Sequence, residues 1–233
     1  MKKISVVIPA HNEEKYIEKC LLSLENQSIP RKDYEIIVVN DSSTDKTKSV
    51  AKKYADRVID VHARIVGKAR DVGFKKASGW IIASTDADTI VPRNWLELIS
   101  NDLSGGAVAV YGTARVSDGG TLLVTLSGIA YTLFLFLNHY AGRPNLAGFN
   151  FAVKKSAVKK VGYFNPALRS CEDIDLAQRL LKVGKVLLNT NLITYTSMRR
   201  IRKYGYWKFL AYNMGNYFRY YSTGKGNKYT ESH

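Results

Sequence analysis

Apolar and polar positions alternate along the first hundred residues in a pattern typical of repeated strand and helix units. Four short apolar runs, at 4–9, 35–40, 57–61 and 80–84, have the length and composition of buried strands. Between them, residues 13–27, 44–55 and 68–77 carry apolar side chains at helical spacing. This alternation predicts a mostly parallel sheet flanked by helices, which is the α/β class.

The pattern changes after the fourth strand. A helix begins near Pro92, because proline suits the first helical turn, and a fifth strand follows at 107–114. Beyond Arg115 come a long uncharged stretch, a strand at 147–153 and an amphipathic helix at 172–182. We find no repeat and no interdomain linker, so we expect one domain over 1–200. A basic, aromatic C-terminal helix over 201–233 would pack on that domain or on a membrane.

Composition and charge narrow the choice of partners. The 233 residues are 45% hydrophobic and 24% charged, which suits a folded domain with a full core. A net charge of +15 indicates attraction to phosphorylated ligands or anionic lipid. Zinc-finger spacing and RRM-type motifs are absent from the sequence, so we expect no nucleic-acid partner. Two cysteines and no cleavable signal favour a cytoplasmic protein.

Three acidic clusters lie where an α/β protein binds ligands, outside the carboxyl ends of strands or at a helix start. They are Asp41-Ser-Ser-Thr-Asp45, Asp86-Ala-Asp88 and Cys171-Glu-Asp-Ile-Asp175. Each has a structural explanation, since Asp, Ser and Thr cap helices and acids in a first turn suit the helix dipole. Asp86 and Asp88 also have the spacing to hold a divalent cation.

Four segments in order carry a resemblance to a known family. They are ISVVIPAHNEEKYIEKCLLSL, IIVVNDSSTDKT, GKARDVGFKKASGWIIASTDADT and AGFNFAVKKSAVKKVGYFNPALRSCEDIDLAQRLLKVGK. From Ile4 to about Arg200 the chain resembles the inverting family 2 glycosyltransferases of the GT-A fold. Within that family it looks most like the dolichyl-phosphate sugar synthases and related single-transfer members.

The resemblance implies a nucleotide-sugar site assembled from distant segments. Pro9, Ala10, Asn12 and Glu13 match the segment that receives the nucleotide, Asp41 the aspartate that bonds the base, and Lys68 and Arg70 the basic pair facing the diphosphate. Asp86, Ala87 and Asp88 match the metal-binding Asp-x-Asp, and Asp173 matches the catalytic base. We further expect Glu172, Arg199 and Arg200 to contact the acceptor or a phosphate. For the two arginines the reason is that guanidinium groups suit bidentate phosphate contacts.

The implied chemistry is an inverting, metal-assisted single displacement. A nucleotide diphosphate leaves readily when Mn²⁺ or Mg²⁺, held by Asp86 and Asp88, neutralises its growing charge. Asp173 would take the proton of the attacking acceptor hydroxyl. A lipid-phosphate acceptor is already ionised and would not need this base. UDP- and GDP-linked donors both suit Asp41.

The chain departs from the family pattern in two places. Asp71 stands where the family often has Asn after the arginine, and an acid there would weaken diphosphate binding unless it points elsewhere. No Gln-x-x-Arg-Trp motif follows the Glu-Asp pair, which argues against a processive synthase.

The stretch 119–142 has no Asp, Glu, Lys or Arg and is long enough to cross a bilayer. A single crossing would separate Asp86 and Asp88 from Asp173, so we favour a helix at the membrane interface or over the acceptor cleft, and keep an ordinary core helix as the alternative. Its apolar face would be formed by Leu122, Leu126, Ile129, Leu133 and Phe136.

The segment 204–221 is half aromatic and follows a cluster of Arg and Lys, as in interfacial helices. We therefore expect a peripheral protein on the inner face of the cell membrane, with a lipid-linked or glycan acceptor.

Two other functions remain open. One is a non-catalytic membrane- or polyanion-binding module on a decayed transferase fold, which the net charge of +15 also suits. The other is a nucleotidyltransferase, which shares the need for metal and phosphate binding. Against it, the first strand is not followed by a glycine-rich phosphate loop.

Overall fold

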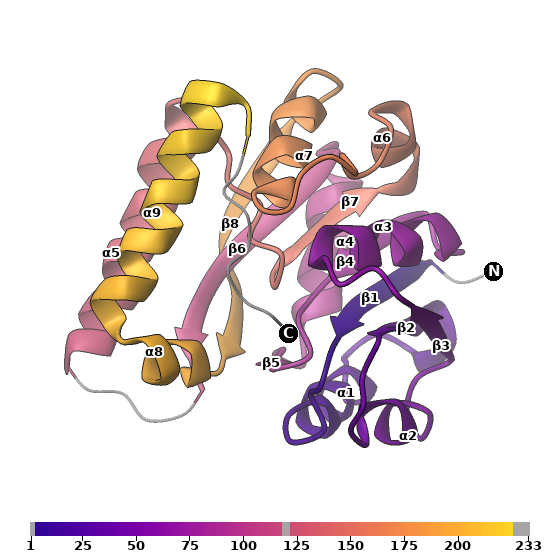
Figure 1. Cartoon of the computed structure of the whole chain (residues 1–233). Helices are drawn as coiled ribbons and strands as arrows, with labels where there is room; N and C mark the ends of the chain where they lie inside the picture. The colour runs from indigo at the N-terminus through magenta and orange to yellow at the C-terminus, as the bar shows by residue number, and fades with distance from the viewer. Residues whose placement is uncertain (1–2, 118–121, 226–233) are drawn as a thin grey trace.

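One sheet organises the part of the chain that the structure describes, residues 3–117 and 122–225 (Figure 1). The chain is represented by a computed structural model. Its strand order is β3-β2-β1-β4-β7-β6-β8-β5. One half of the sheet contains β1 (Ile4–Ala10), β2 (Tyr34–Asp41), β3 (Arg57–Val61) and β4 (Ile81–Ser84). They are mutually parallel, as the sequence predicts.

The other half of the sheet is mixed. It contains β5 (Thr89–Ile90), β6 (Ala109–Val116), β7 (Phe151–Lys154) and β8 (Val186–Thr196). Strand β7 runs antiparallel to both β4 and β6, whereas β8 is parallel to β6 across a register shift between Tyr111 and Thr113. Because β7 reverses direction, its first residue lies at the same sheet edge as the last residue of β4.

Helices cover both faces of the sheet. They are α1 (Ile17–Glu25), α2 (Thr47–Ala51), α3 (Val66–Lys76), α4 (Trp95–Ser104), α5 (Leu122–Tyr140), α6 (Lys155–Lys160), α7 (Glu172–Leu181), α8 (Arg199–Tyr204) and α9 (Tyr206–Thr223), with a short 3-10 helix at Arg31–Asp33. The predicted helices are present, but α1 and α2 are shorter than their apolar spacing indicates.

The core has two parts because the central strands are buried on both sides. In β1, Val6 packs with α1 and α4 on one face, while Val7 packs with α3 and α7 on the other. Successive residues of a strand point to opposite faces, so both neighbours in the sequence must be apolar. This explains why β1 and β2 read as unbroken apolar runs.

Helices α5 and α9 lie side by side along one flank of the sheet (Figure 1). The Tyr217 hydroxyl of α9 bonds the Asn138 amide of α5, and the rings of Phe134 and Tyr217 meet edge to face with centroids 5.2 Å apart. On its other side α9 reaches α7, where Gln178 donates to the Tyr221 hydroxyl at 3.0 Å. These contacts hold the C-terminal half of α9 against α5 and α7.

Parts of two segments singled out in the sequence, 119–121 and 226–233, lie outside the described residues. Within the described residues, none of the helices combines the length and apolar character needed to cross a membrane. The five residues predicted as the apolar face of the 119–142 helix are exposed, whereas Leu135 on another side of α5 is buried. An ordinary core helix would bury that face.

Candidate active site

The residues predicted to bind a nucleotide sugar come together at the carboxyl-terminal edge of the parallel strands. The loops after β1 and β2 and the turns that begin α3 and α7 each contain a non-glycine residue with left-handed backbone: Asn12, Ser42, Arg64 and Cys171, with φ between 49° and 61°. Such conformations are uncommon away from glycine and cluster at functional loops. Four of them at one sheet edge mark it as the site to examine.

The loops after β1 and β2 are joined by hydrogen bonds. The Asn12 N–H donates to the Ser43 hydroxyl at 3.1 Å, and the Asn12 side-chain oxygen accepts from the Thr44 N–H at 2.9 Å. The Asp41 carboxylate accepts the N–H groups of Ala63 and Arg64 at 2.9 and 3.0 Å. Pro9 and Ala10 end a buried strand beneath these loops. The sequence prediction that these residues contact a nucleotide stays a prediction.

One buried arginine connects two of the acidic clusters. Arg70 on α3 donates to the Asp86 carboxylate at 2.6 Å and to the Glu172 carboxylate at 2.7 Å, and only 4% of its side chain is exposed. Burial alone would lower the pKa of Arg70, but the charges of Asp86, Glu172 and Asp173 outweigh it and hold that pKa above its usual value. The Asp-x-Asp turn and the start of α7 are thus fixed to each other.

Two glycines make room for this ion pair network. A Cβ at position 148 would lie 2.3 Å from the Arg70 guanidinium, and one at position 67 would lie 2.8 Å from Cγ of Glu172. Glycine is the residue that permits such a close approach. The Gly148 carbonyl also accepts the Ser84 hydroxyl at 2.9 Å, which ties this turn to the end of β4.

Asp173 lies beside this network at the first turn of α7. One carboxylate oxygen accepts the Gly148 N–H at 3.0 Å, and the other accepts the Ile174 N–H at 2.9 Å. Burial and the neighbouring charge of Glu172 raise the pKa of Asp173 to about 7, against the opposing pull of Arg70. A carboxyl group with a pKa near neutrality is suited to exchange protons under physiological conditions. The raised pKa is compatible with proton transfer by Asp173, whose role as the base stays a prediction.

A second arginine holds the other half of the Asp-x-Asp pair. Arg199, the first residue of α8, donates to the Asp88 carboxylate at 2.9 Å and also ion-pairs with Glu13, while its guanidinium lies over the Tyr16 ring. Burial, more than the nearby Asp88, raises the pKa of Glu13 to about 7. Burial and the charge of Asp86 likewise raise the pKa of Asp88. Both acids of the pair thus have a guanidinium partner.

The remaining predicted residues differ in accessibility. Lys68 is exposed on the first turn of α3, Arg200 follows Arg199 at half-buried depth, and Ala87 is buried between the two aspartates. Glu172 is buried against Arg70, and its predicted contact with acceptor or phosphate stays a prediction. Asp71 points away from Arg70, because its carboxylate binds Lys75 at 2.6 Å.

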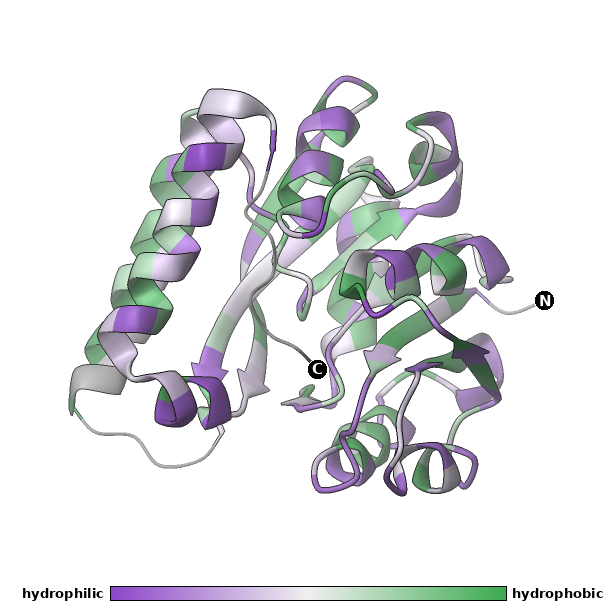
Figure 2. Cartoon of the chain, viewed as in Figure 1, coloured by the Kyte–Doolittle hydropathy of each residue, from purple (hydrophilic) through white to green (hydrophobic). Residues whose placement is uncertain are grey.

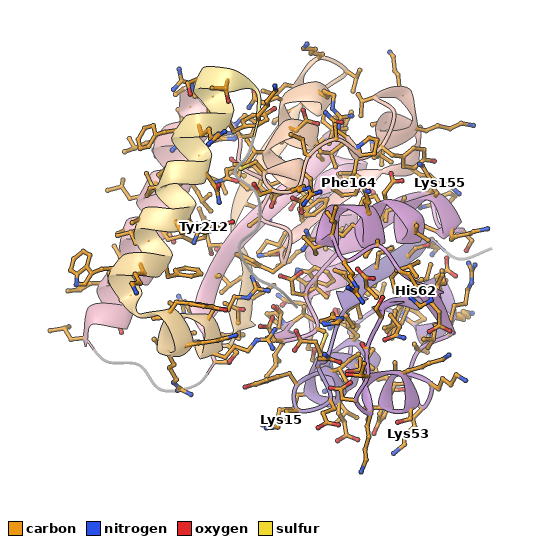
Figure 3. All side chains as sticks on the ribbon, viewed as in Figure 1. Lys15, Lys53, His62, Lys155, Phe164 and Tyr212 are labelled. Carbon is orange, nitrogen blue, oxygen red and sulfur yellow. The ribbon has the colours of Figure 1, made fainter. Side chains whose placement is uncertain are left out.

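The structure adds two residues that sequence reasoning missed. Gly148 supplies the N–H that holds Asp173, and Tyr131 of α5 lies close enough for the charge of Asp173 to add to burial in raising the pKa of that tyrosine. Gly148 lies in the segment AGFNFAVKK quoted above, which was a signal that could have pointed to it, whereas Tyr131 lies in none of the four segments. His62, labelled in Figure 3, follows β3 at the same carboxyl-terminal edge. Its ring Nδ1 lies 3.1 Å from the Ser42 hydroxyl oxygen.

The donor atoms fit a divalent cation that is shared with a diphosphate. Among the residues that the structure describes, no group of three or more His, Cys, Asp or Glu could enclose a metal ion. Asp86 and Asp88 offer two carboxylates, and Mg²⁺ is commonly held by one or two carboxylates together with substrate phosphates. A site of this kind depends on the ligand for the rest of its coordination.

The comparisons with known proteins decide the family. The model of "Glycosyl transferase family 2" matches residues 5–162, more than half of the sequence. The chain belongs to glycosyl transferase family 2. This confirms the resemblance seen in the four sequence segments, and the matched range includes Asp41, Arg70 and the Asp86–Asp88 pair.

Relatives of this family 2 chain include transferases of Haloferax volcanii and Methanococcus voltae. Glycosyltransferase AglE of Haloferax volcanii is 28% identical over 190 residues, which cover 78% of this chain and 62% of AglE. A dolichyl N-acetyl-alpha-D-glucosaminyl phosphate 3-beta-D-2,3-diacetamido-2,3-dideoxy-beta-D-glucuronosyltransferase of Methanococcus voltae is 41% identical over 86 residues, covering 34% of this chain and 27% of that protein. The chain thus spans less than two thirds of either relative.

A solved structure confirms the GT-A fold. The mannosyltransferase PcManGT of Pyrobaculum calidifontis, in complex with GDP-Man and Mn²⁺, superposes with a TM-score of 0.73 at 21% identity. The superposition covers 93% of this chain and 64% of PcManGT. At this identity the likeness concerns the fold.

Proposed function

We propose that this family 2 glycosyltransferase transfers a sugar, with inversion, from a UDP- or GDP-linked donor to a lipid-phosphate or membrane-presented glycan. The observation that carries the proposal is the single network in which Arg70 joins Asp86 to Glu172, beside Asp173 with its pKa near 7. The network brings Asp86, the proposed cation ligand, and Asp173, the proposed proton acceptor, to one edge of the sheet and so supports the proposal.

The donor half of the site is Asp86 and Asp88. These carboxylates would hold Mn²⁺ or Mg²⁺ together with the diphosphate, and the cation would supply Lewis-acid stabilisation of the leaving group. The GDP-Man and Mn²⁺ named for PcManGT support this assignment. Arg199 and Arg200 lie next to Asp88 and would neutralise further phosphate charge once Arg199 exchanges its carboxylate partners for the diphosphate.

The acceptor half of the site is Asp173. Its ionised carboxylate takes the proton from an acceptor hydroxyl as that oxygen attacks the anomeric carbon, and the sugar–diphosphate bond breaks on the opposite side. The Gly148 and Ile174 N–H groups keep the carboxylate oriented during this step. An acceptor phosphate would attack as the anion and leave Asp173 with a positioning role.

The acceptor class is supported by the relatives. The Methanococcus voltae transferase acts, by its name, on a dolichyl-linked sugar phosphate. The matched region is less than half of either chain. Transfer assays with a lipid phosphate and with a glycan distinguish the two acceptor classes.

The test is cation-dependent turnover of nucleotide sugars by Asp88→Asn. We expect release of UDP or GDP from UDP- or GDP-sugars in the presence of Mn²⁺, and a loss of about 10²-fold or more in the variant, because diphosphate stabilisation of this kind is usually the largest catalytic contribution. The matched control is Asp33→Asn, an aspartate that pairs with Lys3 away from the site.

Unchanged turnover in Asp88→Asn would contradict the proposed cation site. If no nucleotide sugar binds in calorimetry while the folded protein binds anionic vesicles, the non-catalytic binding module is correct instead. Release of pyrophosphate in place of a nucleoside diphosphate would establish a nucleotidyltransferase.

A further inference from the structure

Helix α5 presents an apolar face to solvent. Six residues spaced three or four apart form what we call the α5 apolar face: Leu122, Leu126, Ile129, Leu133, Leu137 and Tyr140. Their exposed fractions lie between 53% and 77%. At 100° per residue these positions fall within an arc of about 80°. Single exposed leucines are ordinary, but a continuous stripe of this length marks an interaction surface.

The opposite side of α5 belongs to the domain. Leu135 is fully buried, and Tyr131 and Phe134 pack against the same core cluster as Tyr111 and Phe151. Tyr131 also lies near Asp173, whose charge helps to raise the tyrosine pKa. The helix is therefore held in place, with one side packed on the domain and another facing outward.

Basic and aromatic residues lie next to the α5 apolar face. The Ser127 hydroxyl of α5 donates to the Tyr206 hydroxyl of α9 at 2.9 Å, which places the exposed Trp207 and Lys208 beside the start of α5. Helix α8, just before it, carries the exposed Arg202 and Lys203. Figure 2 shows α5 largely in the hydrophobic colour and α8 in the hydrophilic one.

The charge on this flank has one sign. No Asp or Glu occurs between Leu176 and Thr230, although Lys and Arg recur throughout, and α5 has no charged residue. We would expect a surface that binds a protein to carry both positive and negative side chains. An apolar stripe edged by cations and an exposed tryptophan instead complements an anionic lipid surface.

We infer that the α5 apolar face, together with Trp207 and the basic residues of α8, docks this protein on an anionic lipid bilayer with α5 in the interface. The inference rests on the proposed function for its purpose, since a protein docked in this way would meet a lipid-borne acceptor at the bilayer surface. Its test does not require turnover.

The first experiment is flotation with vesicles of phosphatidylcholine alone or mixed with phosphatidylglycerol. We expect binding to the mixed vesicles, and the triple variant Leu126→Gln, Ile129→Gln, Leu133→Gln to weaken it by about tenfold or more, because apolar area that enters the interface supplies the affinity. The control is Leu22→Gln with Trp80→Gln, which removes apolar side chains of 46% and 61% exposure outside α5, α8 and α9. Equal vesicle binding by wild type and triple variant overturns the inference.

The second experiment uses Trp207 as a reporter. Trp80→Phe leaves Trp95, which is fully buried, and Trp207, which is 73% exposed. Vesicles should shift the tryptophan emission of this variant to shorter wavelength as Trp207 leaves water. Vesicle binding without such a shift would assign docking to another face and overturn the inference.

Two controls separate the alternatives. Sedimentation velocity without lipid reports self-association, and a wild-type dimer that the triple Gln variant abolishes would assign the face to a second copy of the chain. Release of nucleoside diphosphate from a sugar donor is measured in parallel. Turnover without vesicle binding removes the docking inference alone, and vesicle binding without turnover removes the proposed function alone.

Discussion

The protein environment of Asp173 sets the pKa of its carboxyl group and therefore the pH range in which it can accept a proton. The carboxyl group lies among protein atoms, with the negative Glu172 as its sequence neighbour and only part of the Arg70 charge to offset both. Because desolvation and a like charge both disfavour the ionised form, the pKa rises from that of an ordinary aspartate to about 7. The proton-accepting form is therefore the minority species in acid solution.

The pH dependence of transfer to a hydroxyl acceptor follows from this value. We expect kcat/KM to fall about tenfold for each pH unit below about 7 and to level off above it, because only ionised Asp173 accepts the proton. Asp173→Asn should lower turnover by about 10²- to 10⁴-fold and remove this limb of the profile.

The control is Asp175→Asn on the same helix, where the carboxylate binds Arg179 and Tyr220. This variant should keep the wild-type pH profile. A profile that is flat across neutrality in the wild-type protein would exclude Asp173 as the base.

The turn before β7 depends on glycine for a packing reason. We expect Gly148→Ala to lower the free energy of unfolding by about 1–3 kcal/mol, measured by urea denaturation, because the new methyl group would overlap the Arg70 guanidinium. Turnover should fall with it, since Arg70 and the Gly148 N–H both move.

Gly215→Ala is the matched control. Gly215 lies inside α9 and a Cβ there meets nothing within 4 Å, so alanine should raise the free energy of unfolding by up to about 1 kcal/mol. A stable, fully active Gly148→Ala would show that the Arg70 network tolerates a shift.

Much of the sheet could be predicted because its apolar runs are continuous. The four parallel strands and the helices between them follow from periodicity, and motifs predicted Asp86, Asp88 and Asp173 as site residues, a prediction that their shared network supports. Strand β8 was not predicted, since Asn189, Thr190 and Asn191 interrupt its apolar run and its pairing with β6 restarts beyond the register shift.

Long-range contacts were beyond sequence reasoning. Arg70 and Glu172 are 102 positions apart, and no local pattern shows that they form an ion pair. The same holds for Tyr131, which resembles any other helical aromatic residue until the packing of α5 is known. Spacing along α5 predicted four of the six residues of its apolar face, Leu122, Leu126, Ile129 and Leu133, but Leu137, Tyr140 and the direction of the face required the fold.

The balance of charge across the molecule is uneven. The net charge of +15 arises largely from a C-terminal part without acids, while the acids that matter gather at the carboxyl-terminal edge of the parallel strands. There, Arg70 and Arg199 already partner Asp86 and Asp88. Little uncompensated negative charge is left to attract a free cation.

This charge compensation predicts an order of binding, in which the cation binds tightly only together with the nucleotide. We expect Mn²⁺ alone to bind weakly in calorimetry, and to bind at least about tenfold more tightly with UDP or GDP present, because the diphosphate brings the anionic charge that the arginines have neutralised.

Arg199→Gln should strengthen binding of Mn²⁺ alone by freeing Asp88, whereas Arg202→Gln one turn along α8 should leave it unchanged. Tight binding of the bare ion to the wild-type protein would contradict this. If the prediction holds, the Arg199 guanidinium occupies Asp88 in the free protein and keeps the metal site closed until the cation and the nucleotide bind as one complex.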